Sequence, residues 1–275
     1  MVLDNAKYHR AMVWASKKLD WFATDSEGSF KEELAEDPNN KDLLYYKKNP
    51  IVYKFNNYGF RSHIDFYEGM EGNIFLGCSH TFGIGHHLEN VWSWKVNQAI
   101  GGNFINLSIG GSGISTAARI LHAYKNFFKP KNIFLHHPHP YRYEHFNPAT
   151  KRWVVYMCNT SNSNDIFNHG LNSSPYFKNM LLDPNTAKRN YLTNYYWIKN
   201  IAKDLGANFY CIPIVDNYKV RKGNIIPERT RDQHHNVSYH THLTNLFLDQ
   251  IKNGYKENIP DYMFHYKWDV KRNLI

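Results

Sequence analysis

The sequence has 275 residues, of which 42% are hydrophobic and 21% are charged. This length and balance predict one folded domain over residues 1–275 with a sizeable core, and they exclude a disordered chain. The formal net charge of +9 comes from lysines and arginines spread along the chain, without a basic arm or zinc-finger spacing. We therefore expect no specific contact with nucleic acid.

The cellular location is read from the cysteines and from the start of the chain. Three cysteines (Cys78, Cys158 and Cys211) are too few, and odd in number, for a disulfide framework, which favours a reducing compartment. The first residues lack the apolar region of a signal peptide, and no run of about 18 apolar residues predicts a membrane span. We therefore predict a cytoplasmic protein. A composition rich in Asn, Lys, Ile and Tyr is typical of an AT-rich genome, including a viral one.

The first fifty residues are predicted to be a helical lead-in. Residues 11–22 have helix-like apolar spacing, and Asn49-Pro50 closes the segment. The following stretch, residues 51–62, alternates aromatic residues around a turn at Asn56-Asn57. This region precedes the part of the chain in which strands and helices alternate.

Strands and helices alternate from Gly72 onward. Short apolar runs predict strands near 73–76, 104–109, 132–135 and 209–215, and helical patterns cover about 91–100, 115–128, 187–205 and 239–251. This alternation predicts a parallel sheet with helices packed on it. Residues 136–186 are polar apart from a strand-like run at 153–157, so we predict a long insertion that can act as a lid.

A serine stands where a parallel sheet usually carries its ligand site. The run Gly77-Cys78-Ser79 follows the first predicted strand, so Ser79 lies at the carboxyl edge of the sheet. A serine on a tight turn from strand to helix can act as a nucleophile, with nearby backbone N–H groups as oxyanion donors. The alternative is a serine that only caps the helix.

Two further segments end at the same edge or approach it. Asn106 to Gly113 follows the next strand, and Gly111 can offer its N–H to an oxyanion, although a plain turn or a phosphate loop gives the same pattern. The spacing matches no nucleotide-binding motif. Asp232, His234 and His235 precede the final helix, where an aspartate and a histidine can form the base that a serine nucleophile needs. The alternative is a polar surface loop.

Taken together, these segments resemble the blocks of the SGNH (GDSL-type) hydrolase family. Residues 77–83 resemble its Gly-Asp-Ser-x-Thr-x-Gly block, residues 106–111 its second block, and residues 232–235 its final Asp-x-x-His block; residues 57–61 resemble a stretch that precedes the first block. The resemblance implies a three-layer, flavodoxin-like α/β/α sandwich and ester or acyl hydrolysis without metal or cofactor. It implies Ser79 as nucleophile, His235 as base, Asp232 as its partner, and the N–H groups of Ser79 and Gly111 as oxyanion donors.

The chain departs from the family pattern at three places. Cys78 replaces the aspartate beside the nucleophile, which leaves Cys78 itself as an alternative reactive group. The Gly-x-Asn-Asp block is missing, so we expect His137 or His139 to replace its asparagine as oxyanion donor. The offset from Asp232 favours His235 as base, whereas the spacing to His240 favours His234.

Two other functions stay open on the sequence. Histidines at 136, 137 and 139 and at 234, 235, 240 and 242 form clusters that a zinc or iron site would use, although their spacing fits no known ligand motif. A basic, tyrosine-rich domain without the third block can also be a glycan-binding module that lacks turnover. For an enzyme, we expect a small-molecule or glycan ester, and the aromatic insertion favours carbohydrate O-deacetylation.

Overall fold

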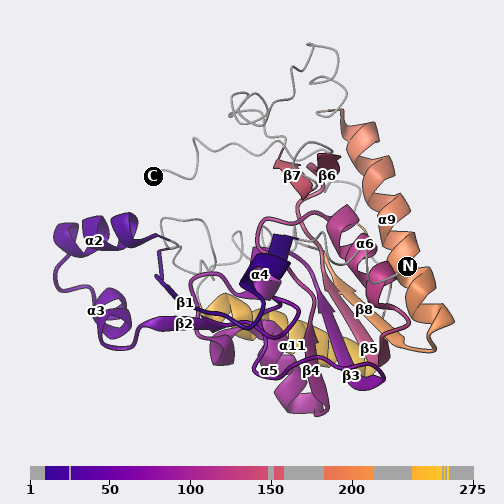
Figure 1. The fold of residues 1–275 in the computed structure, drawn as a ribbon, viewed down its shortest axis with the longest axis horizontal. Coiled ribbons are helices and arrows are strands. Elements are labelled where there is room, and N and C mark those ends of the chain that lie inside the picture. The colour runs from indigo at the N-terminus through magenta and orange to yellow at the C-terminus, as the bar shows by residue number, and fades with distance from the viewer. Residues whose placement is uncertain are drawn as a thin grey trace.

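The computed structural model describes residues 10–24, 26–147, 152–157, 183–213 and 237–255, together with 257 and 259. At its centre is a parallel sheet in the order β4-β3-β5-β8 (Figure 1). The strands are β3 (Met70–Leu76), β4 (Asn103–Asn106), β5 (Phe128–His136) and β8 (Asn208–Ile212). Helices α5 (Trp92–Ile100) and α11 (Val237–Asn253) cover one face, and α6 (Ile114–Tyr124) and α9 (Pro184–Asp204) cover the other. The predicted three-layer α/β/α class is confirmed.

Alternation along the strands explains the two helical layers. Successive side chains of a strand point to opposite faces, and in β3 Ile74 packs toward α6 and α9 whereas Phe75 packs toward α5 and α11. The aromatic side of the sheet stacks Phe75 on Phe134 with ring centroids 4.9 Å apart. Both faces are apolar because both are covered, which is why these strands read as short continuous apolar runs.

The strand order fixes the position of the ligand-binding edge. From β3 the chain crosses to β4 on one side and then returns across β3 to β5 on the other. The direction of winding therefore changes between β3 and β5, and the crevice of such a sheet lies beyond the carboxyl ends of these strands. The loops that follow Leu76 and His136 border this point.

The N-terminal lead-in differs from the prediction. Instead of a helix over residues 11–22, a 3-10 helix η1 (Arg10–Trp14) is followed by strand β1 (Lys18–Trp21), which pairs antiparallel with β2 (Ile51–Lys54). The alternation of Leu19 and Trp21 with polar neighbours supports this pairing, since it half-buries one face of the strand. Helices α2 (Glu27–Glu36) and α3 (Lys41–Lys48) follow β1, as a helical lead-in predicts.

Several helix and strand boundaries differ from the prediction because strand pairing decides them. The predicted helix over 115–128 ends at Tyr124, and β5 begins at Phe128 because it pairs with β3 from Met70 onward. Pro130 lies inside β5, where a register shift next to Gly72 accommodates the missing donor. The insertion contains an antiparallel hairpin of β6 (Arg142–Asn147) and β7 (Arg152–Met157). No helix among the described segments is long and apolar enough to cross a bilayer.

Candidate active site

Ser79 begins a short helix directly beyond the central strand. After β3 the chain turns through Gly77 and Cys78 into α4 (Ser79–Phe82). The φ angle of Gly77 is +152°, and a Cβ atom there would lie 2.1 Å from Thr81 Oγ1 and 2.8 Å from the carbonyl oxygen of His136. Only glycine fits this turn, which packs the end of β3 against the end of β5.

The polar groups of Ser79 face the edge of the sheet with little to engage them. The side chain is buried, and its hydroxyl lies 3.9 Å from Cys78 Sγ, a weak contact. Within the described residues the backbone N–H of Ser79 has no hydrogen-bond partner, as is usual for the first N–H groups of a helix. Cys78 is fully buried, and its side chain does not cap the helix.

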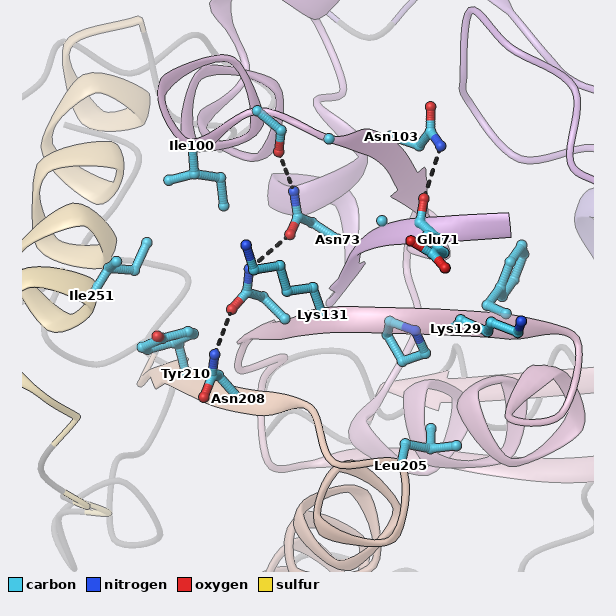
Figure 2. Close-up of a pocket in the computed structure, with 16 residues that line it drawn as sticks. Glu71, Asn73, Ile100, Asn103, Lys129, Lys131, Leu205, Asn208, Tyr210 and Ile251 are labelled. Atoms are coloured by element: carbon cyan, nitrogen blue, oxygen red, sulfur yellow. Dashed lines mark hydrogen bonds between the residues drawn. The ribbon is translucent and has the colours of Figure 1, made fainter. Parts of the chain in front are cut away.

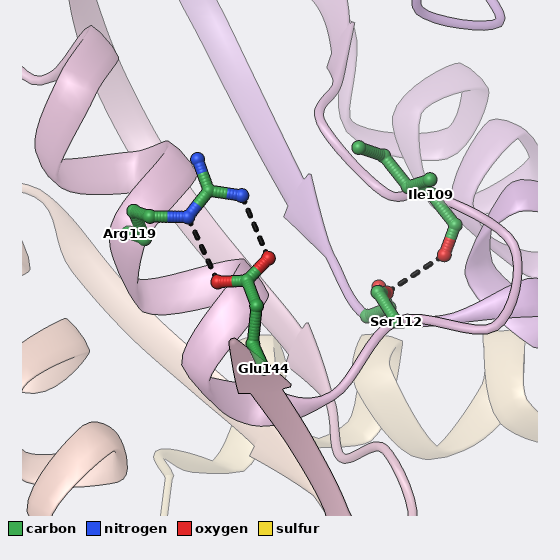
Figure 3. A network of polar contacts seen from close by, with 5 residues as sticks. Ile109, Ser112, Arg119 and Glu144 are labelled. Atoms are coloured by element: carbon green, nitrogen blue, oxygen red, sulfur yellow. Dashed lines mark hydrogen bonds and ion pairs between the residues drawn. The ribbon is translucent and has the colours of Figure 1, made fainter. Parts of the chain in front are cut away.

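The turn that contains Gly111 is hydrogen-bonded to the Gly77 turn that precedes Ser79. Ser112 Oγ lies 2.7 Å from the carbonyl oxygen of Ile109 (Figure 3). It also lies 2.8 Å from the carbonyl oxygen of Gly77, and its one hydrogen is shared between the two. Gly111 has a φ angle of +73°, and its N–H donates to no group in the part of the chain that the structure describes. Two unengaged N–H groups, of Ser79 and Gly111, therefore belong to neighbouring turns at one edge.

The adjacent histidines at the end of β5, His136 and His137, point to opposite faces of the sheet. His136 faces α11, where its Nε2 lies 3.2 Å from the Tyr239 hydroxyl, and burial lowers its pKa to about 3. His137 faces α9, where its ring stacks on Tyr191 at 5.0 Å and its Nε2 contacts Cys211 Sγ. Burial also holds the pKa of His137 well below its ordinary value. The contact with the thiol engages Nε2, whereas the buried Nδ1 has no hydrogen-bond partner among the described residues.

His139 lies in the loop beyond β5 and is half-buried. Its Nδ1 is 3.4 Å from the backbone nitrogen of Tyr141, so Nδ1 accepts and the neutral ring carries its proton on Nε2. Burial, with a smaller contribution from Arg142, lowers the pKa of His139 to about 3. A neutral imidazole with a protonated Nε2 is able to donate a hydrogen bond.

The described members of the two histidine clusters do not converge on a common point. His136 and His137 diverge because adjacent residues at a strand end point to opposite faces. His240 packs edge-on against His86, with ring centroids 4.8 Å apart, and its Nδ1 accepts from the backbone N–H of Trp92. Among the described residues, no three side chains of His, Cys, Asp or Glu lie together as a metal site requires. Asp232, His234 and His235 lie outside the described residues.

An arginine to which the sequence analysis assigned no role holds the end of α4 and the turn after it by hydrogen bonds. Arg61 is buried, and its guanidinium donates to the carbonyl oxygens of Phe82 at 3.0 Å, Gly83 at 2.6 Å and His86 at 2.6 Å. The Tyr53 ring covers it at 4.0 Å. Burial lowers the pKa of Arg61 to about 10, which leaves it charged at neutral pH. The only signal in the sequence was its place in the stretch 57–61 before the serine block.

The hairpin of the insertion is held to the body of the protein by a buried ion pair. Arg119 on α6 bonds both carboxylate oxygens of Glu144 on β6, at 2.8 and 2.7 Å (Figure 3). The same guanidinium lies 4.3 Å from the centre of the Trp153 ring on β7. Arg142 Nη1, at the start of β6, donates to the carbonyl oxygen of Ser112 at 3.2 Å. The hairpin is thereby attached next to the Gly111 turn.

A large groove of about 830 Å³ lies at the opposite edge, where the strands begin. Figure 2 shows a row of amides across it: Asn208 donates to Asn132 at 3.1 Å, and Asn132 donates to Asn73 at 2.8 Å. Asn73 in turn donates to the carbonyl oxygen of Gly101 at 2.7 Å. The three asparagines are partners in the sheet register. Since these amides mainly satisfy one another, we read the row as a structural element of the sheet.

Comparison with known proteins gives a likeness to solved structures alone. No family model and no curated protein matches the chain. Among solved structures, it is similar to a crystal structure of the psychrotrophic esterase EstA from Pseudoalteromonas sp., inhibited by monoethylphosphonate. The match has 15% identity and a TM-score of 0.33, and it covers 66% of this chain and 97% of that one. A likeness at this level assigns no role to any residue.

Proposed function

We propose that this chain is a serine-dependent ester or acyl hydrolase with Ser79 as its nucleophile. One observation carries the proposal. Ser79 begins a helix at the carboxyl edge of the central strand, and its own N–H and that of Gly111 have no partners among the described residues. Unengaged backbone donors beside a serine hydroxyl are what the developing oxyanion of acyl transfer requires.

The proposed reaction uses a base from the segment before α11. His235 removes the hydroxyl proton of Ser79 as the oxygen attacks the ester carbonyl, and Asp232 accepts from the other ring nitrogen. The N–H groups of Ser79 and Gly111 stabilise the oxyanion. The alcohol leaves with the proton from His235, and water, activated by the same histidine, releases the acid from Ser79.

The start of α11 supports a base in this segment. Tyr239 on α11 bonds His136, and its ring lies 6.1 Å from that of His80, the neighbour of Ser79. His235 is four residues before Tyr239, and an extended chain spans at most about 3.5 Å per residue, or roughly 14 Å here. This reach admits His235 at Ser79, and it equally admits His234 as the alternative base.

The third oxyanion donor stays open in this proposal between His137 and His139. The Nε2 of His137 contacts Cys211 Sγ, and the Nδ1 of His139 accepts from the backbone N–H of Tyr141, so the donor would be Nδ1 of His137 or Nε2 of His139. We expect alanine at the true donor to lower kcat by about ten- to a thousandfold and to change KM little, as for other oxyanion donors, and alanine at the other histidine to lower kcat by less than about tenfold.

The test is hydrolysis of chromogenic acyl esters and of acetylated sugars. We expect Ser79→Ala to reduce kcat by a factor of about 10³ or more, and substitution of the true base to have a similar effect. Ser115→Ala, on α6 at the same edge, is the matched control and should stay within about twofold. Unchanged rates in Ser79→Ala would refute the proposal, and retained rates in both His234→Ala and His235→Ala would refute the base.

The same panel addresses the substrate and the other candidate functions. The aromatic hairpin, with Trp153 on β7, favours a glycan ester, and cleavage of acetylated sugars ahead of simple esters would support a carbohydrate O-deacetylase. Saturable sugar binding without turnover would favour a binding module. Loss of activity in Cys78→Ala with full activity in Ser79→Ala would move the nucleophile to Cys78.

A further inference from the structure

A second concave site lies in the N-terminal layer, between α2, α3 and the start of β2. It has a volume of about 380 Å³, within the range of small-molecule sites. Figure 1 shows α2 and α3 beyond β1 and β2, on the side of the molecule away from the central sheet. Its apolar lining comes from Trp21, Phe22, Phe30, Leu34, Tyr46 and Ile51. We call it the lead-in slot.

The slot is rigid on its inner side. Trp21 stacks on Tyr53 with ring centroids 5.2 Å apart, and Phe22 packs against Phe30 at 5.8 Å. Its inner wall continues into the buried cluster that contains Tyr53 and Phe82, so it cannot close by collapse of loose side chains. Leu34 on α2 also lines the slot and is only half-buried. An apolar surface of this shape favours an apolar body in the slot.

The charged side chains of the slot have one sign. Lys31 on α2 and Lys47 on α3 line it, and no acidic side chain does so among the described residues. Lys31 is paired with Glu27 at 2.8 Å, on an exposed surface where such a pair is weak. Lys47 is exposed and has no ion-pair partner in the described part of the chain. A ligand with an apolar body and an anionic head group complements both features.

We propose that the lead-in slot binds an amphiphilic carboxylate, with the alkyl chain against Trp21 and Leu34 and the head group at Lys47. The proposal does not depend on hydrolysis at Ser79. It concerns a separate surface, whose lining contains no residue of the Ser79 or Gly111 turns. A carboxylate with a medium-length alkyl chain is therefore a suitable probe.

The experiment titrates the full chain with decanoate, and in parallel with decanol and decyltrimethylammonium, by calorimetry. We expect saturable binding of decanoate, weaker binding of decanol and the weakest binding of the cation. Leu34→Trp fills the slot and should abolish binding. Lys47→Glu should weaken decanoate by about three- to tenfold, as expected for an exposed charge contact that is reversed, without a comparable effect on decanol.

Matched controls separate binding from unfolding. Lys48→Glu changes the neighbouring exposed lysine of α3, which does not line the slot, and should alter affinity less than twofold. Near-ultraviolet circular dichroism of each variant reports the fold. Because the alkyl chain is proposed to lie against Trp21, decanoate should also change the tryptophan fluorescence of the wild type. Trp21→Phe should lose this fluorescence change and keep the calorimetric signal. Equal effects of Lys47→Glu and Lys48→Glu would overturn the head-group contact.

Other occupants of the slot would be recognised in the same experiment. Absence of saturable decanoate binding would overturn the proposal and would fit a slot covered by another segment of this chain. A change of sedimentation coefficient in Leu34→Trp, with unchanged decanoate affinity, would overturn it in favour of an interface between copies. Ser79→Ala should bind decanoate like the wild type, so failure of the hydrolase proposal would leave this result unaffected.

Discussion

Replacing Arg61 with methionine should remove the support behind the candidate nucleophile. Three buried carbonyl oxygens, of Phe82, Gly83 and His86, accept from this one guanidinium at 2.6–3.0 Å. Hydrogen bonds from a charged donor contribute roughly 1.5–3 kcal/mol each. Methionine keeps the apolar stem near the Tyr53 ring but donates to none of the carbonyls. The substitution therefore isolates the hydrogen bonds from the packing.

The loss is smaller than the three bonds together, because the charge itself is expensive to bury. Burial lowers the pKa of Arg61 from 12.5 to about 10. At about 1.4 kcal/mol per pKa unit, removing the charge returns roughly 3.5 kcal/mol. We expect the free energy of unfolding to fall by about 1–5 kcal/mol. Arg61→Lys should be intermediate, because one ammonium cannot reproduce the planar fork that reaches three carbonyls.

The assay is urea denaturation followed by far-ultraviolet circular dichroism, together with ester hydrolysis under conditions where the variant is folded. Because the bonded carbonyls belong to α4 and the turn after it, we expect kcat to fall more than KM rises. Arg189→Met, an exposed arginine on α9, is the control and should cost less than about 0.5 kcal/mol. A loss below about 1 kcal/mol in Arg61→Met, with unchanged hydrolysis, would refute this reasoning.

Three further predictions concern the turn, the hairpin and acid pH. Gly77→Ala places a methyl group against the backbone of β5, and should destabilise the protein by about 2–4 kcal/mol and abolish hydrolysis. Glu144→Gln leaves Arg119 without its buried counter-charge and should cost about 2–4 kcal/mol, with faster proteolysis of the hairpin. His136 and His137 are buried with lowered pKa values, so below about pH 6.5 the unfolded chain alone binds their protons. Each of these histidines should therefore lower the free energy of unfolding by about 1.4 kcal/mol for every pH unit that the pH falls below this value. Urea midpoints at several pH values measure this slope.

Each of these has its own control. For the turn, Gly28→Ala tests a glycine with nothing within 4 Å of the added methyl group, and equal losses at both positions would contradict the argument. For the ion pair, Arg119→Met combined with Glu144→Leu should recover much of the loss, and no recovery would contradict a charge effect. For the acid slope, His136→Gln should remove the share of one histidine, about 1.4 kcal/mol per pH unit, because His137 and His139 also have lowered pKa values and keep theirs. Both proteins should have a flat slope from this source above about pH 7.5.

The sequence by itself determined the layered class and the position of the serine. Short apolar runs alternating with helical patterns are enough to predict a parallel sheet, because only strands covered on both faces are apolar throughout. Gly77 and Ser79 could be placed at the carboxyl edge for the same reason, since a residue directly after a parallel strand has nowhere else to lie. The prediction that the N–H groups of Ser79 and Gly111 serve together as oxyanion donors stays a prediction.

Only the tertiary structure decided what the polar residues around this edge contact. The histidines after β5 look like one cluster in sequence, yet His136 and His137 separate because a sheet divides them. The apolar residues over 11–22 have helix-like spacing, which led to the wrong prediction of a helix there. Residues 18–21 form β1 instead, because β2, some thirty residues later in the chain, pairs with them. The role of Arg61 exists only because the fold brings three carbonyl groups, from the end of α4 and the turn after it, to its guanidinium. Such long-range pairings depend on which surfaces meet, and local spacing does not carry that information.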